Sequence, residues 1–237
     1  MLGSAHQGRT TLFRSGEFLI LLAAILYSFY PIVSVYAVPA AHPTFIVAQI
    51  FLFYAIFNIL PSLFTESARR TARQELRRLH RDWESFIAAL TDALAHLCFF
   101  YALGLGSAIV ASAIFETWPF FAMLTSFLFL KGQHRLPGFG KIVISLVAVF
   151  GVWVLTAEPF ESSRSLQGVT AKLVVFALLA ALLGAIASNH HNRLAKLFGA
   201  RRKFNRYLAM QFVRSVYFIA ISGILFCVGV WVSGAPP

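Results

Sequence analysis

The sequence predicts an all-α membrane protein, a polytopic bundle of about seven transmembrane helices. Three observations lead to this prediction: 59% of the 237 residues are hydrophobic, only 12% are charged, and the mean hydropathy is +0.75. Average soluble domains carry about 25% charged residues, and one core of this length cannot bury so much apolar surface. A lipid bilayer would solvate the apolar surface that the core cannot bury. The composition therefore excludes a soluble enzyme, a disordered protein and a disulfide scaffold.

A helix that crosses the bilayer needs about 20 mostly apolar residues, because the hydrocarbon core is about 30 Å thick and a helix rises about 1.5 Å per residue. In lipid, an open chain satisfies its own backbone hydrogen bonds only as a helix. Polar or breaker-rich joints separate the apolar stretches at 39–43, 104–106 and 131–138. The helices are expected at 17–39, 44–64, 86–103, 107–130, 142–157, 170–189 and 207–232.

The first stretch also raises the question of a cleaved signal peptide, because it follows Arg9 and Arg14 and ends near small residues. Its apolar part exceeds the roughly 7–15 residues of a signal peptide. We therefore expect a retained first helix. The stretch at 142–157 is the shortest of the seven and carries the weakest signal.

The basic residues are unevenly distributed, although the net charge is +11. Seventeen of the 20 Lys and Arg residues fall in alternate joints, at 1–16, 65–85, 131–141 and 193–206. This is the positive-inside bias of a membrane protein, and it predicts a cytoplasmic amino terminus and an external end for residue 237. We expect a bacterial-type inner membrane, with anionic headgroups as the partner of the basic face and no nucleic-acid partner.

The longest of these basic joints has a helical pattern of its own. Apolar residues recur at helical spacing between Glu66 and Glu84, with arginines on the other faces. The pattern is typical of a short helix lying at the membrane interface, its arginines reaching lipid headgroups. A solvated loop that only carries orienting charge explains the segment equally well.

Two pairs of stretches suggest an internal repeat. Residues 21–26 (LLAAIL) resemble 178–183 (LLAALL), and 45–51 (FIVAQIF) align with 207–213 (YLAMQFV). Since the first helix is expected to run outward and the sixth inward, five helices per unit give an inverted repeat, as in many transporters. The predicted units are a tail at 1–16, a first repeat at 17–158 and a truncated second repeat at 169–237.

The stretch from Tyr101 to Leu155 resembles the second part of an EamA domain, in the drug/metabolite transporter superfamily. The residues that carry the resemblance are Ala102-Leu103, Ser107-Ala108, Pro119, Leu128-Phe129-Leu130 and Gly151-Val152. Lys131-Gly132-Gln133 departs from the pattern, where Gly-Glu is usual. The resemblance implies a carrier of small metabolites or drugs, more often an exporter. It also implies ten helices, so this chain is either a fragment or a shortened form, and a complete chain would have to pair as a homodimer to transport.

Four ionisable residues lie near the middle of the predicted helices: Asp92, His96, Glu116 and Arg214. An ionised side chain at a helix centre costs about 2.5–3.5 kcal/mol on insertion scales, so each needs a partner or a function. In a transport site, Arg214 would bind an anionic group, and Asp92 or Glu116 a cationic group or a coupling proton. Alternatively, Arg214 only neutralises one of the carboxylates and holds helices together.

Other polar or aromatic residues are weaker candidates for the same site. Pro119 predicts a helix break that supplies a hinge or a free carbonyl, or a simple packing kink. Trp118 is expected to stack on a substrate or only to pack, and Gln49 and Gln211 to line the path or to form an interhelical hydrogen bond. His190 and His191 fall at the inner end of the sixth predicted helix, which favours an interfacial position.

The leading hypothesis is therefore a metabolite transporter that works by alternating access, with no enzymatic activity and no metal or other cofactor. Asp92 and His96 at i, i+4 spacing also suggest an intramembrane zinc hydrolase, which needs a third ligand such as His190 or His191. No hydrolase signature such as Gly-x-Ser-x-Gly or His-Glu-x-x-His appears in the sequence. A non-transporting scaffold or fragment is the third alternative.

Overall fold

The computed structural model describes residues 41–64, 83–129, 171–199 and 204–234, together with eight isolated positions. These residues form helices and short turns, with no strand in the described ranges. Five segments of this part are long and apolar enough to cross a membrane. The stretches predicted at 17–39 and 142–157 lie outside the described residues except for a few positions, as does most of the predicted interfacial helix.

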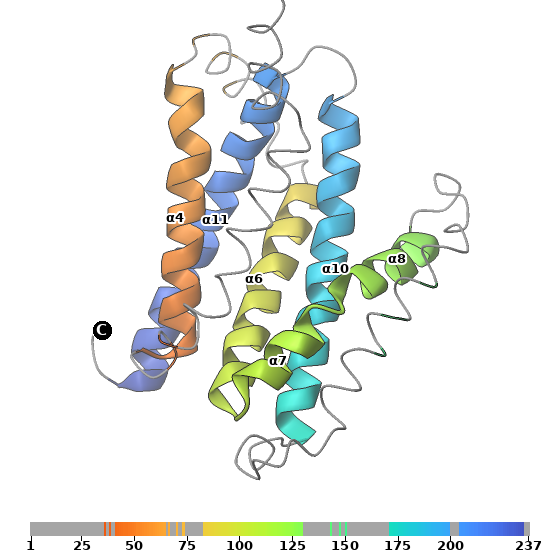
Figure 1. Ribbon diagram of the computed structural model, residues 1–237. Helices are drawn as coiled ribbons and strands as arrows, with labels where there is room; N and C mark the ends of the chain where they lie inside the picture. The colour runs from red at the N-terminus through yellow and green to blue at the C-terminus, as the bar shows by residue number, and fades with distance from the viewer. Residues whose placement is uncertain are drawn as a thin grey trace, which may run out of the picture.

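Figure 1 shows the described helices in chain order, each a tilted rod of the bundle. They are α4 (Pro43–Phe64), α6 (Trp83–Gly104), α7 (Ala108–Phe115), α8 (Trp118–Phe129), α10 (Ala171–Gly199) and α11 (Phe204–Ser233). The bounds of α4, α6 and α11 lie within three residues of the predicted helices at both ends. The sixth predicted helix is the main exception, because α10 continues ten residues beyond Asn189.

The stretch predicted over 107–130 is divided into α7 and α8, and the division lies just before Pro119, where a helix break is predicted. The Ser107 side chain caps α7 by accepting a hydrogen bond from the Val110 amide. The α-helical pattern ends at Phe115, where the Thr117 amide donates to the Ile114 carbonyl in a tight turn. Pro119 follows in the first turn of α8, where its missing N–H costs nothing. The ring of a proline inside a continuous helix would clash with the preceding turn, which explains the break.

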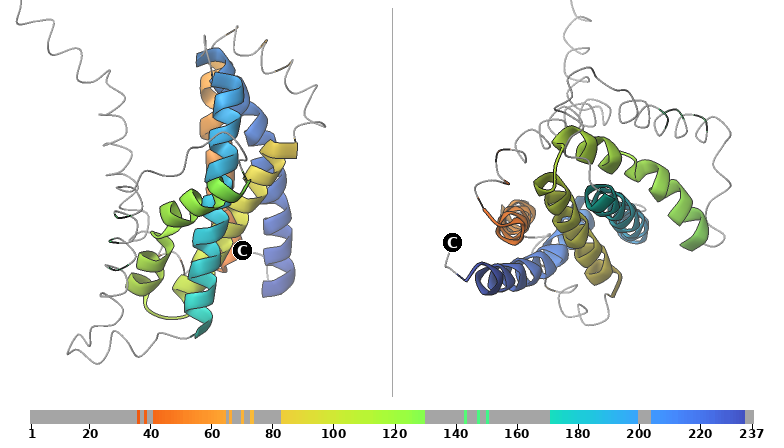
Figure 2. Two further views of the ribbon diagram at one scale, coloured as in Figure 1. Left: turned by 90° about the vertical axis from the view of Figure 1, so that its right-hand side faces the viewer. Right: turned by 90° about the horizontal axis from the view of Figure 1, so that it is seen from below.

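Two antiparallel helix pairs dominate the packing. The pair α4–α11 and the pair α6–α10 make the most extensive interhelical contacts, and α7 and α8 pack mainly on α10. Seen from below in Figure 2, α6 lies between the α4–α11 pair and α10. Each pair joins one helix from the range predicted as the first unit (17–158) to one from the range predicted as the second (169–237).

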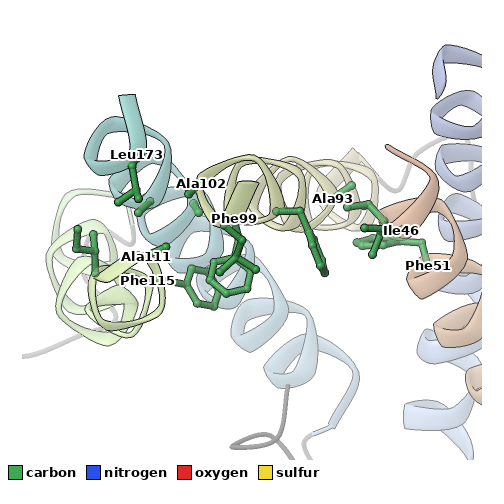
Figure 3. Packing of buried hydrophobic residues seen from close by; sticks show 14 of the residues in the cluster. Ile46, Phe51, Ala93, Phe99, Ala102, Ala111, Phe115 and Leu173 are labelled. Carbon is green, nitrogen blue, oxygen red and sulfur yellow. The ribbon is translucent and has the colours of Figure 1, made fainter. Parts of the chain in front are cut away.

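Small residues let α6 and α10 approach closely. Ala88, Ala89, Ala95 and Ala102 of α6 are fully or almost fully buried, and so are Ala177, Ala180, Ala181 and Ala185 of α10. Close backbone packing of this kind drives helix association in lipid, where no hydrophobic force acts between helices. Figure 3 shows the aromatic part of this core, where the ring of Phe99 lies 4.6 Å from that of Phe115.

The contact between α4 and α11 uses a polar bond and a small residue. The Ser222 hydroxyl donates to the Ala48 carbonyl at 2.7 Å across the buried interface. Near the other end, Gly229 of α11 lies so close to α4 that an added Cβ would meet the Thr44 hydroxyl at 2.6 Å. Large apolar side chains such as Phe53, Phe57 and Phe226 are exposed on the outside of this pair. Such a surface is suited to lipid.

The helix ends divide the described bundle into two sides. The end of α4, the end of α10 and the start of α11 lie at the top of Figure 1, and the start of α6 is the upper end of that helix, below them. The segments that connect these ends, 65–82 and 200–203, hold nine arginines and lysines between them. We call this side the basic side. Glu66, Arg70 and Arg73 of the first segment are helical and exposed, with Arg70 Nη2 lying 2.6 Å from Glu66 Oε1.

Candidate functional site

A cavity of about 260 Å³ lies between the two helix pairs. Its polar lining comes from four helices: Tyr54 of α4, Asp92 and His96 of α6, Ser188 and His191 of α10, and Arg214 of α11. Aromatic and small residues complete the wall: Phe115, Trp118, Ala95, Gly184 and Ala187. The cavity thus joins charged, aromatic and small side chains inside a bundle of otherwise apolar helices.

The cavity lies well along the helices from their ends at the basic side. Each of the four lining helices contributes one titratable residue about eight to ten residues from its end at the basic side: Tyr54, Asp92, His191 and Arg214. At about 1.5 Å per residue this is a depth of about 12–15 Å. The hydrocarbon core is about 30 Å thick, so a membrane around these helices places the cavity near its middle.

Asp92 and His96 share one face of α6, as their i, i+4 spacing predicts. The His96 Nδ1 lies 2.8 Å from the Asp92 backbone carbonyl oxygen and 3.5 Å from its Oδ1. Because a carbonyl oxygen only accepts, the hydrogen bond requires the proton on Nδ1. The imidazole also meets the rings of Phe51 and Tyr54 edge to face, at 5.6 and 6.3 Å. These contacts fix the ring orientation at the cavity wall.

Arg214 brings a positive charge to the same cavity from the other helix pair. Its Nη2 lies 3.9 Å from Asp92 Oδ2, and its guanidinium carbon lies 4.9 Å from the centre of the Phe218 ring. Both charged side chains are largely buried, with 12% and 19% of their areas exposed. A separation of 3.9 Å is at the limit of an ion pair and too long for a hydrogen bond. The two charges therefore attract each other without a hydrogen bond between these two atoms.

The sequence favours an interfacial position for His190 and His191, and the structure shows that His191 lines the cavity. α10 continues to Gly199, so His191 is a helical residue that lines the cavity, and its Nε2 is buried. Gly184, Ala187, Ser188 and His191 follow at i, i+3, i+4 and i+7 and face the cavity together. The unbroken polar run 188–193 is the sequence feature that could have predicted this position. Six consecutive helical residues point in all directions around the helix axis, so some of these polar side chains must face the interior of the bundle.

Trp118 joins this site, whereas three other candidates do not line the cavity. Glu116 lies at the C-cap of α7 and is exposed among the described residues. Gln49 is exposed on α4, and Pro119 lies in the first turn of α8. Gln211 belongs to α11, but its side chain is outside the described residues. Tyr54 and Ser188 are cavity residues that no pattern in the sequence singles out.

The sequence model of the EamA-like transporter family matches residues 14–157, more than half of the chain. The chain belongs to the EamA-like transporter family. Comparisons with curated proteins and with solved structures gave no match. The family and the apolar helices together make the chain a multi-pass membrane protein, and the family's members are transporters of small molecules rather than enzymes.

The family match covers only part of the cavity wall. Asp92, His96, Trp118 and Tyr54 fall within the matched residues, whereas α10 and α11 follow them in the chain. The charges of Asp92 and Arg214 thus come from inside and outside the matched region. In the described residues, no group of three His, Cys, Asp or Glu side chains is arranged to hold a metal ion.

Proposed function

We propose that this EamA-family protein exports small metabolites or drugs, and that the cavity between the two helix pairs binds the substrate. The observation that carries the proposal is the pair Asp92 and Arg214, one charge from each helix pair, both lining the same cavity. An ionised residue inside a membrane helix is expensive and usually functional. Export, rather than import, rests on the resemblance to the family.

Arg214 is proposed to bind an anionic group of the substrate, and Asp92 a cationic group or a coupling proton. The pair is well placed for both tasks because the two charged side chains lie 3.9 Å apart and each is largely buried. A ligand with both a positive and a negative group replaces the attraction between Asp92 and Arg214 by two shorter ion pairs, one with each residue. Phe115 and Trp118 offer apolar and π surface to the rest of the molecule.

Alternating access is proposed to occur by movement of the α4–α11 pair against the α6–α10 pair. Contacts within each pair are extensive, and those between the pairs are fewer. The cavity lies where the pairs meet, so a small rotation of one pair opens it toward one side and closes it toward the other. Antiparallel α4 and α11 also fit the inverted repeat predicted from their aligned sequences.

An Ala187→Leu substitution tests the site. Ala187 is 2% exposed and lines the cavity, so the added side chain has the cavity as its nearest free space. We expect transport in proteoliposomes to fall at least tenfold, for whichever compound a thermal-shift screen of metabolites identifies. Ala220→Leu makes the same change on an exposed surface of α11 and is the matched control. Equal transport by the two variants would place the substrate elsewhere.

A further inference from the structure

The polar run Ser188–Arg193 of α10 contacts three different parts of the bundle. Consecutive helical residues point about 100° apart, so six polar residues surround the whole helix. Ser188 and His191 face the cavity. Asn189 faces α8, where its Nδ2 donates to the Ala122 carbonyl at 2.9 Å and to the Thr125 hydroxyl at 2.6 Å. Arg193 faces α6.

Glu84, at the start of α6, forms an ion pair with Arg193, the last residue of this run. Arg193 Nη2 lies 3.1 Å from Glu84 Oε1, and His190 interacts electrostatically with both of these residues. Glu84 lies in the first turn of α6, eight residues before Asp92, so it is about 12 Å closer to the basic side. A line of ionisable groups thus leads from the cavity, through His191 and His190, to Glu84.

Three polar atoms on this line are buried and lack a hydrogen-bond partner among the described residues. They are His191 Nε2, His190 Nδ1 and Glu84 Oε2. Buried polar groups in proteins are almost always satisfied, and ordered water supplies the partner where side chains do not. Three such atoms on neighbouring turns of two packed helices indicate water molecules between them.

We infer that His191, His190 and Glu84 form a hydrated proton path between the cavity and the basic side of the protein. A proton from water on that side binds the Glu84 carboxylate and passes to His190, whose imidazolium releases a proton from its other ring nitrogen to His191. His191 then delivers a proton to the cavity, where Asp92 accepts it. One proton moves and no other reactant is needed, because an imidazole accepts on one nitrogen and donates from the other.

Several charged or titratable groups set the protonation of this path. His191 faces Arg214 of α11 and its neighbour His190, and it shares the cavity with Tyr54 of α4 and with Asp92 and His96 of α6. His190 faces Glu84 of α6 and Arg193 of its own helix. From α7 and α8, only Phe115 and Trp118 reach the cavity lining. The path thus lies between the Asp92–Arg214 pair at the cavity and the Glu84–Arg193 pair at the start of α6.

Hydrogen–deuterium exchange at the histidine ring carbon tests the path without a substrate. The full chain is placed in nanodiscs in deuterium oxide at a series of pH values, and each histidine is followed by mass spectrometry. We expect His190 and His191 to exchange within about tenfold of His42, which lies at the opposite end of the bundle. Exchange more than a hundredfold slower than that of His42 would show a dry site and overturn the inference.

The role of Glu84 is tested by Glu84→Gln, with Asn192→Gln as the control on the exposed side of the same polar run. The Glu84 change is expected to shift the exchange midpoint of His190, which lies near Glu84, and to shift that of His191 by less. Equal midpoints in the two variants would also overturn the path. The inference rests on the proposed transport function, yet the two fail separately: dry histidines in a transporting protein refute only the path, and a chain that exchanges normally but transports nothing refutes only the function.

Discussion

Asp92 and Glu116 are the two carboxylates that the sequence placed at mid-depth, and the structure gives them different surroundings. Asp92 lines the cavity and lies 3.9 Å from Arg214, whereas Glu116 is exposed among the described residues. Sequence alone ranks them equally, because both interrupt apolar helices. Their different surroundings make Asp92 the stronger candidate for binding a substrate or a proton.

Replacing each carboxylate by its amide separates the two. Asp92→Asn is expected to lower transport at least tenfold and to remove its pH dependence, because Arg214 loses its counter-charge and the site its titratable acid. Glu116→Gln is expected to keep transport within about twofold. Flux in proteoliposomes at several pH values checks both. Full, pH-dependent transport by Asp92→Asn would show that this carboxylate has no coupling role.

Two glycines of α11 provide a second residue-scale test. A Cβ added at Gly229 would lie 2.6 Å from Thr44 Oγ1 and 2.9 Å from Phe45 Cε1. Overpacking of this kind costs about 1–3 kcal/mol, so Gly229→Ala is expected to destabilise the protein. At Gly223 nothing lies within 4 Å, and Gly223→Ala is expected to be neutral or stabilising by about 0.5–1 kcal/mol. Thermal unfolding in detergent measures both variants. The packing of α4 on α11 would be wrong if both tolerated alanine equally.

At the scale of the elements, the broken helix α7–α8 shows how a local signal and a tertiary contact combine. Pro119 predicts a break, and the tight turn at Thr117 supplies it just before the proline. The direction of α8 after the break depends on α10, because Asn189 bonds both the Ala122 carbonyl and the Thr125 hydroxyl. Pro119 accounts for the break in the helix. The hydrogen bonds of Asn189 hold α8 against α10 after the break.

Removing this amide is expected to loosen α8. Hydrogen bonds between membrane helices contribute about 0.6 kcal/mol on average and up to about 1.7 kcal/mol, so Asn189→Ala should lower the unfolding free energy by about 1 kcal/mol. Asn192→Ala, on an exposed position three residues away, is the control. A double-mutant cycle with Thr125→Ala isolates the bond, and a coupling energy of zero would show that Asn189 does not hold α8.

For the molecule as a whole, the basic side predicts the orientation in the membrane. The segments that join the helix ends on this side carry nine Lys and Arg residues, and the positive-inside rule predicts that they face the cytoplasm. Gly106 lies exposed in the turn at the opposite end of the bundle. The two sides of the described bundle are therefore expected to face different compartments.

Cysteine labelling in intact cells tests this orientation. Cys98 and Cys227 are first replaced by alanine, and single cysteines are then introduced as Glu66→Cys on the basic side and Gly106→Cys on the other. A maleimide that does not cross the membrane is expected to label only position 106. Labelling of position 66 before the cells are opened would reverse the orientation.

The sequence by itself determined the membrane class, most helix positions and the family, because these depend on composition, on the length of apolar stretches and on local motifs. It also identified Asp92, His96 and Arg214, since any charge in an apolar helix stands out. Only the tertiary structure decided that these three converge with His191 and Tyr54, and that Glu116 and Gln49 do not line the cavity. Which face of a helix meets which neighbour is fixed by packing across the chain, such as the alanine contact of α6 with α10, and no local pattern contains that information.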